Sequence, residues 1–152
     1  MSTRILGIES SCDETAAAVV AGGREILSSV VASQIDVHRK YGGVVPELAS
    51  REHLKNLMPI IREACDSASV SLADIDLVAV TYAPGLIGAL LVGVSAAKAI
   101  AYAGNIPFIG VHHGEGHILA AHLEYPEIGY PYVALLASGG HTALYHVKGL
   151  GE

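Results

Sequence analysis

Short apolar runs alternate with small polar turns near the amino terminus. Ile5 to Glu9 is mostly apolar and leads into the polar turn Ser10 to Thr15, after which Ala16 to Ala21 is apolar again. The pair Gly22-Gly23 then turns the chain into Glu25 to Ser33, a run rich in Val and Ser. Glycine pairs allow tight turns, and apolar runs of this length between turns are typical of strands. The pattern predicts three consecutive antiparallel strands.

The turn between the first two predicted strands carries groups that could hold an anion. Ser10 and Ser11 provide hydroxyls, and backbone N–H groups at the head of a hairpin can line a phosphate or a metal-bound phosphate. Asp13 or Glu14 could hold the cation through water. The alternative is a solvated hairpin turn without a ligand, and these residues by themselves do not separate the two.

A helical pattern follows Gly42-Gly43. Pro46 suits the first turn of a helix, where its missing N–H is not needed. Pro59 lies inside the pattern and is expected to kink or divide the helix. His53 is expected on the polar face of this helix, as a solvated side chain rather than a ligand. The apolar positions that define the pattern are Leu48, Leu54, Leu57, Met58, Ile61, Ala64 and Cys65.

The central part of the chain is predicted to form a strand, a helix and a second strand. Asp76 to Tyr82 has the length and Val content of a buried parallel strand, and Pro107 to Val111 is a further strand. The segment Ala83 to Ala103 approaches the length of a membrane span, but its Pro and Gly residues and Lys98 favour a buried or interface helix. Because this helix is apolar nearly all round, we expect it to pack on the sheet and also against a partner chain.

Two histidines four residues apart open the next helical segment, which reaches Glu124. On a helix, His113 and His117 lie on one face with Cβ atoms about 5–6 Å apart, close enough to bind one metal ion. Zinc-protease helices carry the general-base glutamate directly after the first histidine, but Gly114 occupies that position here. Glu115 points away from the histidine face. The spacing indicates a metal site and argues against a protease mechanism.

A second hairpin with a small polar turn ends the chain. Tyr132 to Ala137 and Ala143 to Val147 are apolar, and the turn Ser138 to Thr142 between them is rich in Gly and hydroxyl groups. Strand–turn–strand units at both ends of a β-β-β-α-β-α-β-α series resemble the actin-like ATPases (ASKHA, ribonuclease H-like). This resemblance implies an α/β lobe whose mixed sheet has helices on both faces. Residues 1–125 would form lobe one, and residues 126–152 only the first hairpin of a second lobe.

Composition and charge narrow the class of protein. The 152 residues are 51% hydrophobic, which is enough for the core of one domain, or of one domain and the start of another. The formal net charge is −6 and the nine Lys and Arg residues are spread along the chain, so the chain alone is a poor RNA binder. Cys12 and Cys65 form no C-x-x-C pair, and no secretion signal opens the chain. These features predict a reduced cytoplasmic protein.

Five motifs, in order along the chain, carry a resemblance to a known family. The motifs are Ile5 to Thr15 (ILGIESSCDET), Gly43 to Arg51 (GVVPELASR), Pro84 to Leu86 (PGL), His113 to His117 (HGEGH) and Ser138 to Thr142 (SGGHT). The chain resembles the universal tRNA threonylcarbamoyladenosine enzymes, whose bacterial members are the TsaD proteins, formerly described as O-sialoglycoprotein endopeptidases. Because the motifs are spread over nearly the whole chain, their joint signal is specific.

The resemblance implies an acyltransferase that moves a threonylcarbamoyl group from threonylcarbamoyl-adenylate to N6 of the adenosine beside the tRNA anticodon. His113 and His117 match the family's ligands for one divalent metal ion, Fe²⁺ or Zn²⁺. The first phosphate-side turn would contain Glu9, Ser10, Ser11 and Asp13. The family's nucleotide-facing loop, for ATP or threonylcarbamoyl-adenylate, is matched by Ser138, Gly139, Gly140, His141 and Thr142.

A site with these groups could bind the donor nucleotide and activate its acyl carbonyl. An ion held by two neutral imidazoles can anchor phosphate oxygens and polarise the acyl carbonyl. Backbone N–H groups of Gly139 and Gly140 could cradle the adenylate phosphate or the developing oxyanion. The activated mixed anhydride supplies the driving force, so the protein's task is positioning.

The chain also departs from the family pattern. Family members are longer, and their aspartate metal ligand lies in the second lobe, so two histidines alone leave the ion under-coordinated. The chain is therefore expected to be an amino-terminal fragment that is inactive by itself. His112 stands where the family usually has Asn, and Gly114 stands where a larger apolar residue is usual.

The resemblance also implies partners. A TsaB-like paralogue would dock on the lobe-one helices in segments 46–66 and 85–103, a TsaE-like ATPase would assist turnover, and tRNA would be the substrate, with no membrane involved. An exposed apolar face could also produce homodimers. Two other functions stay open: a non-catalytic TsaB-like dimerising scaffold, and the metal-dependent glycoprotein endopeptidase of the former name. The scaffold paralogue lacks the H-x-E-G-H element, and the position of Glu115 opposes the endopeptidase.

Overall fold

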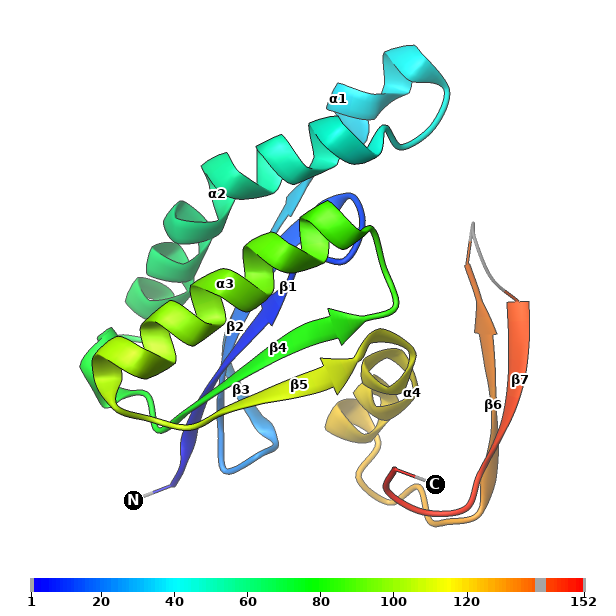
Figure 1. Cartoon of the computed structure of the whole chain (residues 1–152). Coiled ribbons are helices and arrows are strands. Elements are labelled where there is room, and N and C mark those ends of the chain that lie inside the picture. The colour runs from blue at the N-terminus through cyan, green and yellow to red at the C-terminus, as the bar shows by residue number, and fades with distance from the viewer. Residues whose placement is uncertain (1, 139–141, 152) are drawn as a thin grey trace.

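Two β-sheets and four α-helices make up the part of the chain that the computed structural model describes, residues 2–138 and 142–151 (Figure 1). The strands are β1 (Arg4–Glu9), β2 (Glu14–Ala21), β3 (Glu25–Ser33), β4 (Leu77–Ala83), β5 (Phe108–His112), β6 (Tyr132–Ala137) and β7 (Thr142–Val147). The helices are α1 (Ile35–His38), α2 (Pro46–Ser67), α3 (Ile87–Gly104) and α4 (His113–Glu124), with the short 3₁₀ helices η1 (Arg39–Tyr41) and η2 (Leu72–Asp74).

The larger sheet has five strands in the order β3-β2-β1-β4-β5. The strands β1, β2 and β3 pair antiparallel, with Ile8 opposite Ala17 in the first pair, so the three predicted antiparallel strands are confirmed. β4 pairs parallel with β1, and β5 pairs parallel with β4, which confirms the predicted mixed sheet. Because β1, β4 and β5 run in one direction, their carboxyl ends lie at the same edge of the sheet.

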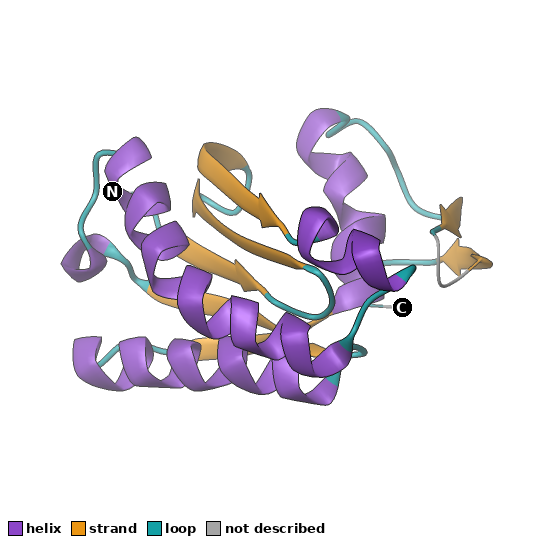
Figure 2. Cartoon of the chain, turned by 90° about the horizontal axis from the view of Figure 1, so that it is seen from above, coloured by secondary structure: helices purple, strands orange, loops and turns teal. Residues whose placement is uncertain are grey.

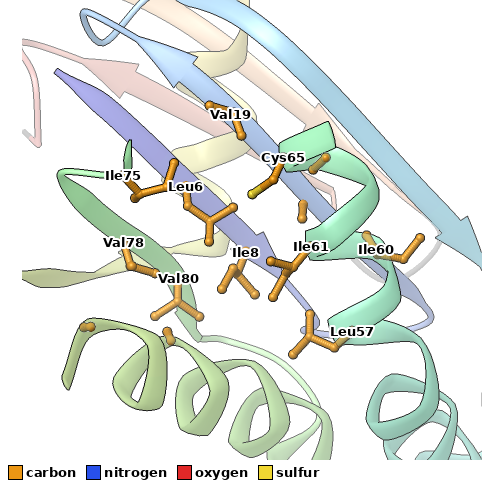
Figure 3. Close-up of a cluster of buried hydrophobic side chains, with 14 residues drawn as sticks. Leu6, Ile8, Val19, Leu57, Ile60, Ile61, Cys65, Ile75, Val78 and Val80 are labelled. Atoms are coloured by element: carbon orange, nitrogen blue, oxygen red, sulfur yellow. The ribbon is translucent and has the colours of Figure 1, made fainter. Parts of the chain in front are cut away.

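The core lies between this sheet and the helices α2 and α3 (Figure 3). Successive side chains of a strand point to opposite faces, and Leu6, Ile8, Val78 and Val80 all point to the helix side. Ile61 of α2 packs against them and is fully buried. Burial of each such side chain contributes about 1.5–3 kcal/mol, so this layer supplies much of the driving force for folding.

The long helix α2 differs from the sequence prediction at Pro59 and at His53. Pro46 occupies its first turn as predicted, but the helix runs through Pro59 to Ser67 and is not divided. His53 does not lie on a polar face; its side chain is fully buried between α2 and the sheet. Ala49 and Leu57, four residues before and after His53, are both buried, so His53 lies within the buried stripe of the helix. The expectation was wrong because the sequence pattern counted Leu54 and Met58 as core positions, and both are exposed.

The opposite face of the sheet is only partly covered. Glu9 and Thr81 alternate with core residues along their strands, so they point to this second face, and α4 approaches them there (Figures 1 and 2). The predicted lobe with helices on both faces is therefore confirmed. Beyond α4 the face is lined by small residues, among them Gly7, Ala16 and Ala79, around an open hollow of about 260 Å³ that extends to Glu9.

The apolar helix α3 packs as part of the domain. Ile87–Gly104 is long and apolar enough to cross a membrane by length and composition, and it is the one such helix in the described residues. Its small residues Ala89, Gly93, Ala97 and Ala101 are buried, and α3 contacts β4, β1 and α2. The part of the prediction that placed α3 on the sheet is confirmed.

The hairpin of β6 and β7 forms its own two-stranded sheet. His122 Nε2 of α4 and the Tyr132 hydroxyl of β6 are 3.0 Å apart, which ties the hairpin to the preceding helix. One face of the hairpin exposes the large side chains Val133, Leu135 and Leu144. The division into residues 1–125 and 126–152 stays a prediction.

Helix α3 approaches the turn after β1 because a glycine stands at the contact. The Ser10 hydroxyl is buried and donates a 2.9 Å hydrogen bond to the Ala89 carbonyl. A Cβ atom at Gly93 would overlap Ser10 Oγ. The glycine therefore sets how closely α3 lies against this turn.

We predict that Gly93→Ala lowers the free energy of unfolding by about 1–3 kcal/mol, because the added methyl group overfills the contact with Ser10. Urea unfolding followed by circular dichroism measures this. Gly116→Ala is the matched control, since a Cβ atom there meets nothing within 4 Å, and it should raise stability slightly. Adding Ser10→Ala to Gly93→Ala should recover part of the loss; equal stabilities for Gly93→Ala and Gly116→Ala would show that the contact is not tight.

Candidate functional site

Polar side chains from three distant parts of the chain meet at the carboxyl edge of the parallel strands. Glu9 is the last residue of β1, Thr81 lies near the end of β4, and His113 begins α4 directly after β5. The chain between Glu9 and His113 folds back so that parallel strands end side by side. This edge is where open α/β sheets place their ligands.

The Glu9 carboxylate is the centre of this cluster. Its Oε1 atom accepts a hydrogen bond from the Ser11 backbone N–H. Its Oε2 atom accepts one from Thr81 Oγ1 at 2.7 Å and lies 3.1 Å from His113 Nδ1. Burial raises the pKa of Glu9, but the hydrogen bonds from Ser11, Thr81 and His113 outweigh burial, so the pKa lies below its ordinary value. Glu9 is therefore a carboxylate at neutral pH.

The Glu9 carboxylate fixes the tautomer of His113. An ionised carboxylate can only accept, so His113 Nδ1 carries a proton and donates a hydrogen bond to Glu9. With the proton on Nδ1, a neutral ring has its lone pair at Nε2. That atom lies 3.0 Å from His117 Nε2, and the two rings meet edge to face with centroids 4.5 Å apart.

The two histidines fit a metal ion. Two nitrogen donors about 2.0–2.1 Å from one ion are about 2.9–3.4 Å from each other for bond angles between about 90° and the tetrahedral value, and the Nε2–Nε2 separation here is 3.0 Å. A carboxylate on the far nitrogen of a metal-bound histidine is the usual arrangement for orienting such a ligand, and Glu9 supplies it. Among the described residues, no third His, Cys, Asp or Glu joins the pair as a ligand.

The two hydroxyl groups of the turn after β1 have different roles: one packs against a helix, and the other faces the histidines. Ser10 points into α3 and is fully buried. Ser11 Oγ lies 3.2 Å from His113 Nδ1, so this hydroxyl faces the histidines. The backbone of the turn is held by Leu86, whose N–H donates to the Ser11 carbonyl at 2.8 Å, and by Gln34, whose N–H donates to the Asp13 carbonyl at 2.9 Å.

The second polar turn is described only in part. Ser138 follows β6 and Thr142 begins β7, and both are exposed. Gly139, Gly140 and His141 lie outside the described residues. The nucleotide-facing role of this loop stays a prediction.

The structure places one residue at the site that the sequence pattern does not indicate. Thr81 lies in a strand that the sequence pattern predicts to be buried, and a hydroxyl near the carboxyl end of such a strand is the signal that could have indicated it. Glu115, in contrast, makes no hydrogen bond to either histidine in the described part of the chain. The carboxylate beside His113 is Glu9, from 104 residues away.

Cys12 lies in the same turn and its thiol is hard to ionise. Partial burial raises its pKa to about 11, with the hydrogen bond and charge of Asp13 acting in the same direction. We predict that iodoacetamide modifies Cys12 about 100-fold more slowly at pH 8 than it modifies a free cysteine. Asp13→Asn removes part of the shift and should speed labelling. Peptide mass spectrometry separates Cys12 from the buried Cys65; equal rates before and after Asp13→Asn would exclude the role of Asp13.

Comparison with known proteins gives the family. A family model described as tRNA N6-adenosine threonylcarbamoyltransferase (TsaD) matches residues 25–152. Proteins of that name from Trichlorobacter lovleyi and Clostridium novyi are 62% and 57% identical over 148 and 149 residues, which is 97% and 98% of this chain but 43% and 44% of the relatives. The chain thus spans less than half the length of these relatives.

A solved structure agrees on the fold. YeaZ from Pseudomonas aeruginosa superposes with a TM-score of 0.59 at 17% sequence identity, over 94% of this chain and 64% of that one. At this identity the likeness concerns the fold alone. From its motifs, the Glu9–His113–His117 arrangement and the extent of the sequence match, the chain belongs to the tRNA N6-adenosine threonylcarbamoyltransferase family.

Proposed function

We propose that this chain is the catalytic-site half of an enzyme that transfers a threonylcarbamoyl group from threonylcarbamoyl-adenylate to N6 of the adenosine beside the anticodon of tRNA. The observation that carries the proposal is the pair of converging histidine Nε2 atoms with Glu9 on the far nitrogen of His113. Relatives with this enzyme name match the chain over nearly its whole length, which supports the same chemistry.

His113 and His117 would hold one divalent ion, Fe²⁺ or Zn²⁺, which when bound supplies Lewis acidity toward phosphate and carbonyl oxygens. Glu9 keeps the Nε2 lone pair of His113 available by accepting a hydrogen bond from its Nδ1–H. Thr81 and the Ser11 N–H in turn keep the Glu9 carboxylate in place. In this series of hydrogen bonds, Thr81 and Ser11 orient Glu9, and Glu9 orients His113.

The proposed transfer exchanges one bond at the carbonyl carbon. The adenosine N6 amine forms a C–N bond to the carbonyl carbon of the threonylcarbamoyl group, and the bond from that carbon to the adenylate phosphate oxygen breaks. AMP leaves with the electron pair, and the amine loses one proton to solvent. The turn after β1 and the loop Ser138 to Thr142 would hold the donor nucleotide, so their contribution is the placement of reacting groups.

The charge of the chain limits its share in RNA binding. With a net charge of −6 and no cluster of Lys or Arg, it offers little attraction for the tRNA backbone. Under this proposal the tRNA is gripped mainly by the rest of the enzyme and by partner proteins.

The outer side of α2 and α3 is the proposed partner surface. A hollow of about 370 Å³ between the two helices is lined mainly by apolar side chains, including Leu54, Met58 and Leu91. Leu91 is 60% exposed and Ile87, one turn earlier, is 80% exposed. Apolar side chains this exposed in one area are typical of a protein interface. We propose that a TsaB-like paralogue docks here, that a TsaE-like ATPase assists turnover, and that the assembly works in the cytoplasm.

The function is tested in a chimera in which this chain replaces the matching segment of the Trichlorobacter lovleyi relative. Given unmodified tRNA, partners, threonine, bicarbonate and ATP, the chimera should form threonylcarbamoyladenosine, measured by nucleoside mass spectrometry. His113→Ala and His117→Ala should each abolish the product, and Glu9→Gln should weaken metal binding about 10–100-fold. Calorimetric titration with Zn²⁺ gives the metal affinity separately. A folded chimera that makes no product beside an active relative would refute the proposal.

The docking surface is tested by charge substitution. We predict that Leu91→Glu lowers the affinity for the TsaB-like paralogue about 100-fold, because it places a carboxylate in the centre of an apolar contact. Tyr102→Glu is the matched control: it lies on the same helix, is 90% exposed, and is outside the hollow. Analytical ultracentrifugation measures both variants, and an equal effect of the two substitutions would place the interface elsewhere.

A further inference from the structure

Four polar side chains are buried together behind the turn that follows β1. Thr15 of β2 and His53 of α2 are fully buried, Gln34 before α1 is 1% exposed, and His38 at the end of α1 is 4% exposed. Burial of uncharged polar groups is costly unless each is hydrogen-bonded, and no buried side-chain polar atom in the described residues lacks a partner. A buried network in which every polar atom is hydrogen-bonded is rigid, so it fixes the position of the backbone groups that it bonds.

The first half of the network has a defined direction. The Val45 backbone N–H can only donate, and it donates to His38 Nδ1 at 3.3 Å. His38 Nε2 therefore carries the ring proton of the neutral imidazole and donates to Gln34 Oε1 at 3.1 Å. This assignment fixes the Gln34 amide, whose nitrogen must point the other way.

The second half ends on the turn. Gln34 Nε2 lies 3.4 Å from His53 Nδ1, and the Thr15 hydroxyl lies 2.8 Å from the same nitrogen, so His53 Nδ1 accepts. His53 Nε2 then carries the proton and donates to the Cys12 carbonyl, which can only accept, at 3.0 Å. A chain of donors thus runs from Val45 at the start of α2 to the middle of the turn.

The bond to Cys12 completes the support of the turn. The neighbouring carbonyls of Ser11 and Asp13 are held by backbone N–H groups of Leu86 and Gln34. Within the described residues, His53 supplies the bond to the carbonyl between them. The same turn donates the Ser11 N–H to Glu9 and sets Ser11 Oγ beside His113. Movement at Cys12 would therefore reach both ends of the Glu9–His113 contact.

We propose that His53 is a positioning residue for the reaction: it acts through the Cys12 carbonyl to fix the turn that orients Glu9, Ser11 and, through them, His113. The inference rests on the proposed function of that site. His53 itself lies fully buried behind the turn, so its side chain has no surface that a substrate could contact. An apolar side chain of similar size would fill the same volume but would leave the Cys12 carbonyl without its donor.

The thiol of Cys12 reports on the turn in this chain directly. His53→Met keeps the side-chain volume and removes the N–H that donates to the Cys12 carbonyl. Because the turn is then held less firmly, we expect iodoacetamide labelling of Cys12 at pH 8 to become about tenfold faster. His53→Gln keeps an N–H that can reach the Cys12 carbonyl and should label within about twofold of the original chain. Ser28→Ala is the matched control, since it also removes a buried hydrogen bond between the sheet and α2 but lies away from the turn. It should lower stability without changing the labelling rate.

Turnover in the chimera tests the positioning role. His53→Met should lower kcat about tenfold with little change in KM for tRNA, His53→Gln should restore most of it, and Ser28→Ala should leave both constants near the original. Equal effects of His53→Met and Ser28→Ala on labelling and kcat would overturn the inference, because His53 would then act only through stability. If the unsubstituted chimera is inactive, the proposed function fails, and the labelling rates alone decide whether His53 fixes the turn.

Discussion

The hydrogen bond between the Glu9 carboxylate and His113 Nδ1 joins the first strand to a helix that begins 104 residues later. It is formed because β1, β4 and β5 run parallel and release their following segments at one edge of the sheet. The same bond sets the histidine tautomer, and with it the atom that faces His117. Without the parallel arrangement, the two histidines would be an isolated pair on a helix, free to adopt either tautomer.

The two faces of the five-stranded sheet have different roles. One face buries Leu6, Ile8, Val78 and Val80 under α2 and α3, and this layer holds the strands in register. The other face carries Glu9 and Thr81 beside small residues that leave an open hollow. Stability and chemistry are thus separated by the alternation of side chains along each strand, so that Ile8 and Glu9, adjacent in sequence, serve opposite purposes.

Close packing of α3 links these two roles. Gly93 and Gly85 allow α3 and its preceding loop to lie directly against Ser10 and Ser11, where any Cβ atom would collide. The Ser10 hydroxyl donates its hydrogen bond to the Ala89 carbonyl and is buried in this contact. The Ser11 hydroxyl faces His113 instead. The polar network through His53 supports the turn from the other side. The turn is therefore held between two helices rather than free in solvent.

The sequence alone predicted the order of the elements, the three antiparallel strands and the family. Hydrophobic periodicity and short motifs are local properties, so they can be recognised in the sequence without a structure. The sequence was also sufficient for the pairing of His113 with His117, since four residues on a helix form one turn. It could not show that Glu9 contacts His113, that Thr81 belongs to the site, or that His53 is buried. Those facts depend on which strand ends lie side by side and which side of a helix meets the sheet, and these long-range contacts are decided only when the whole core packs.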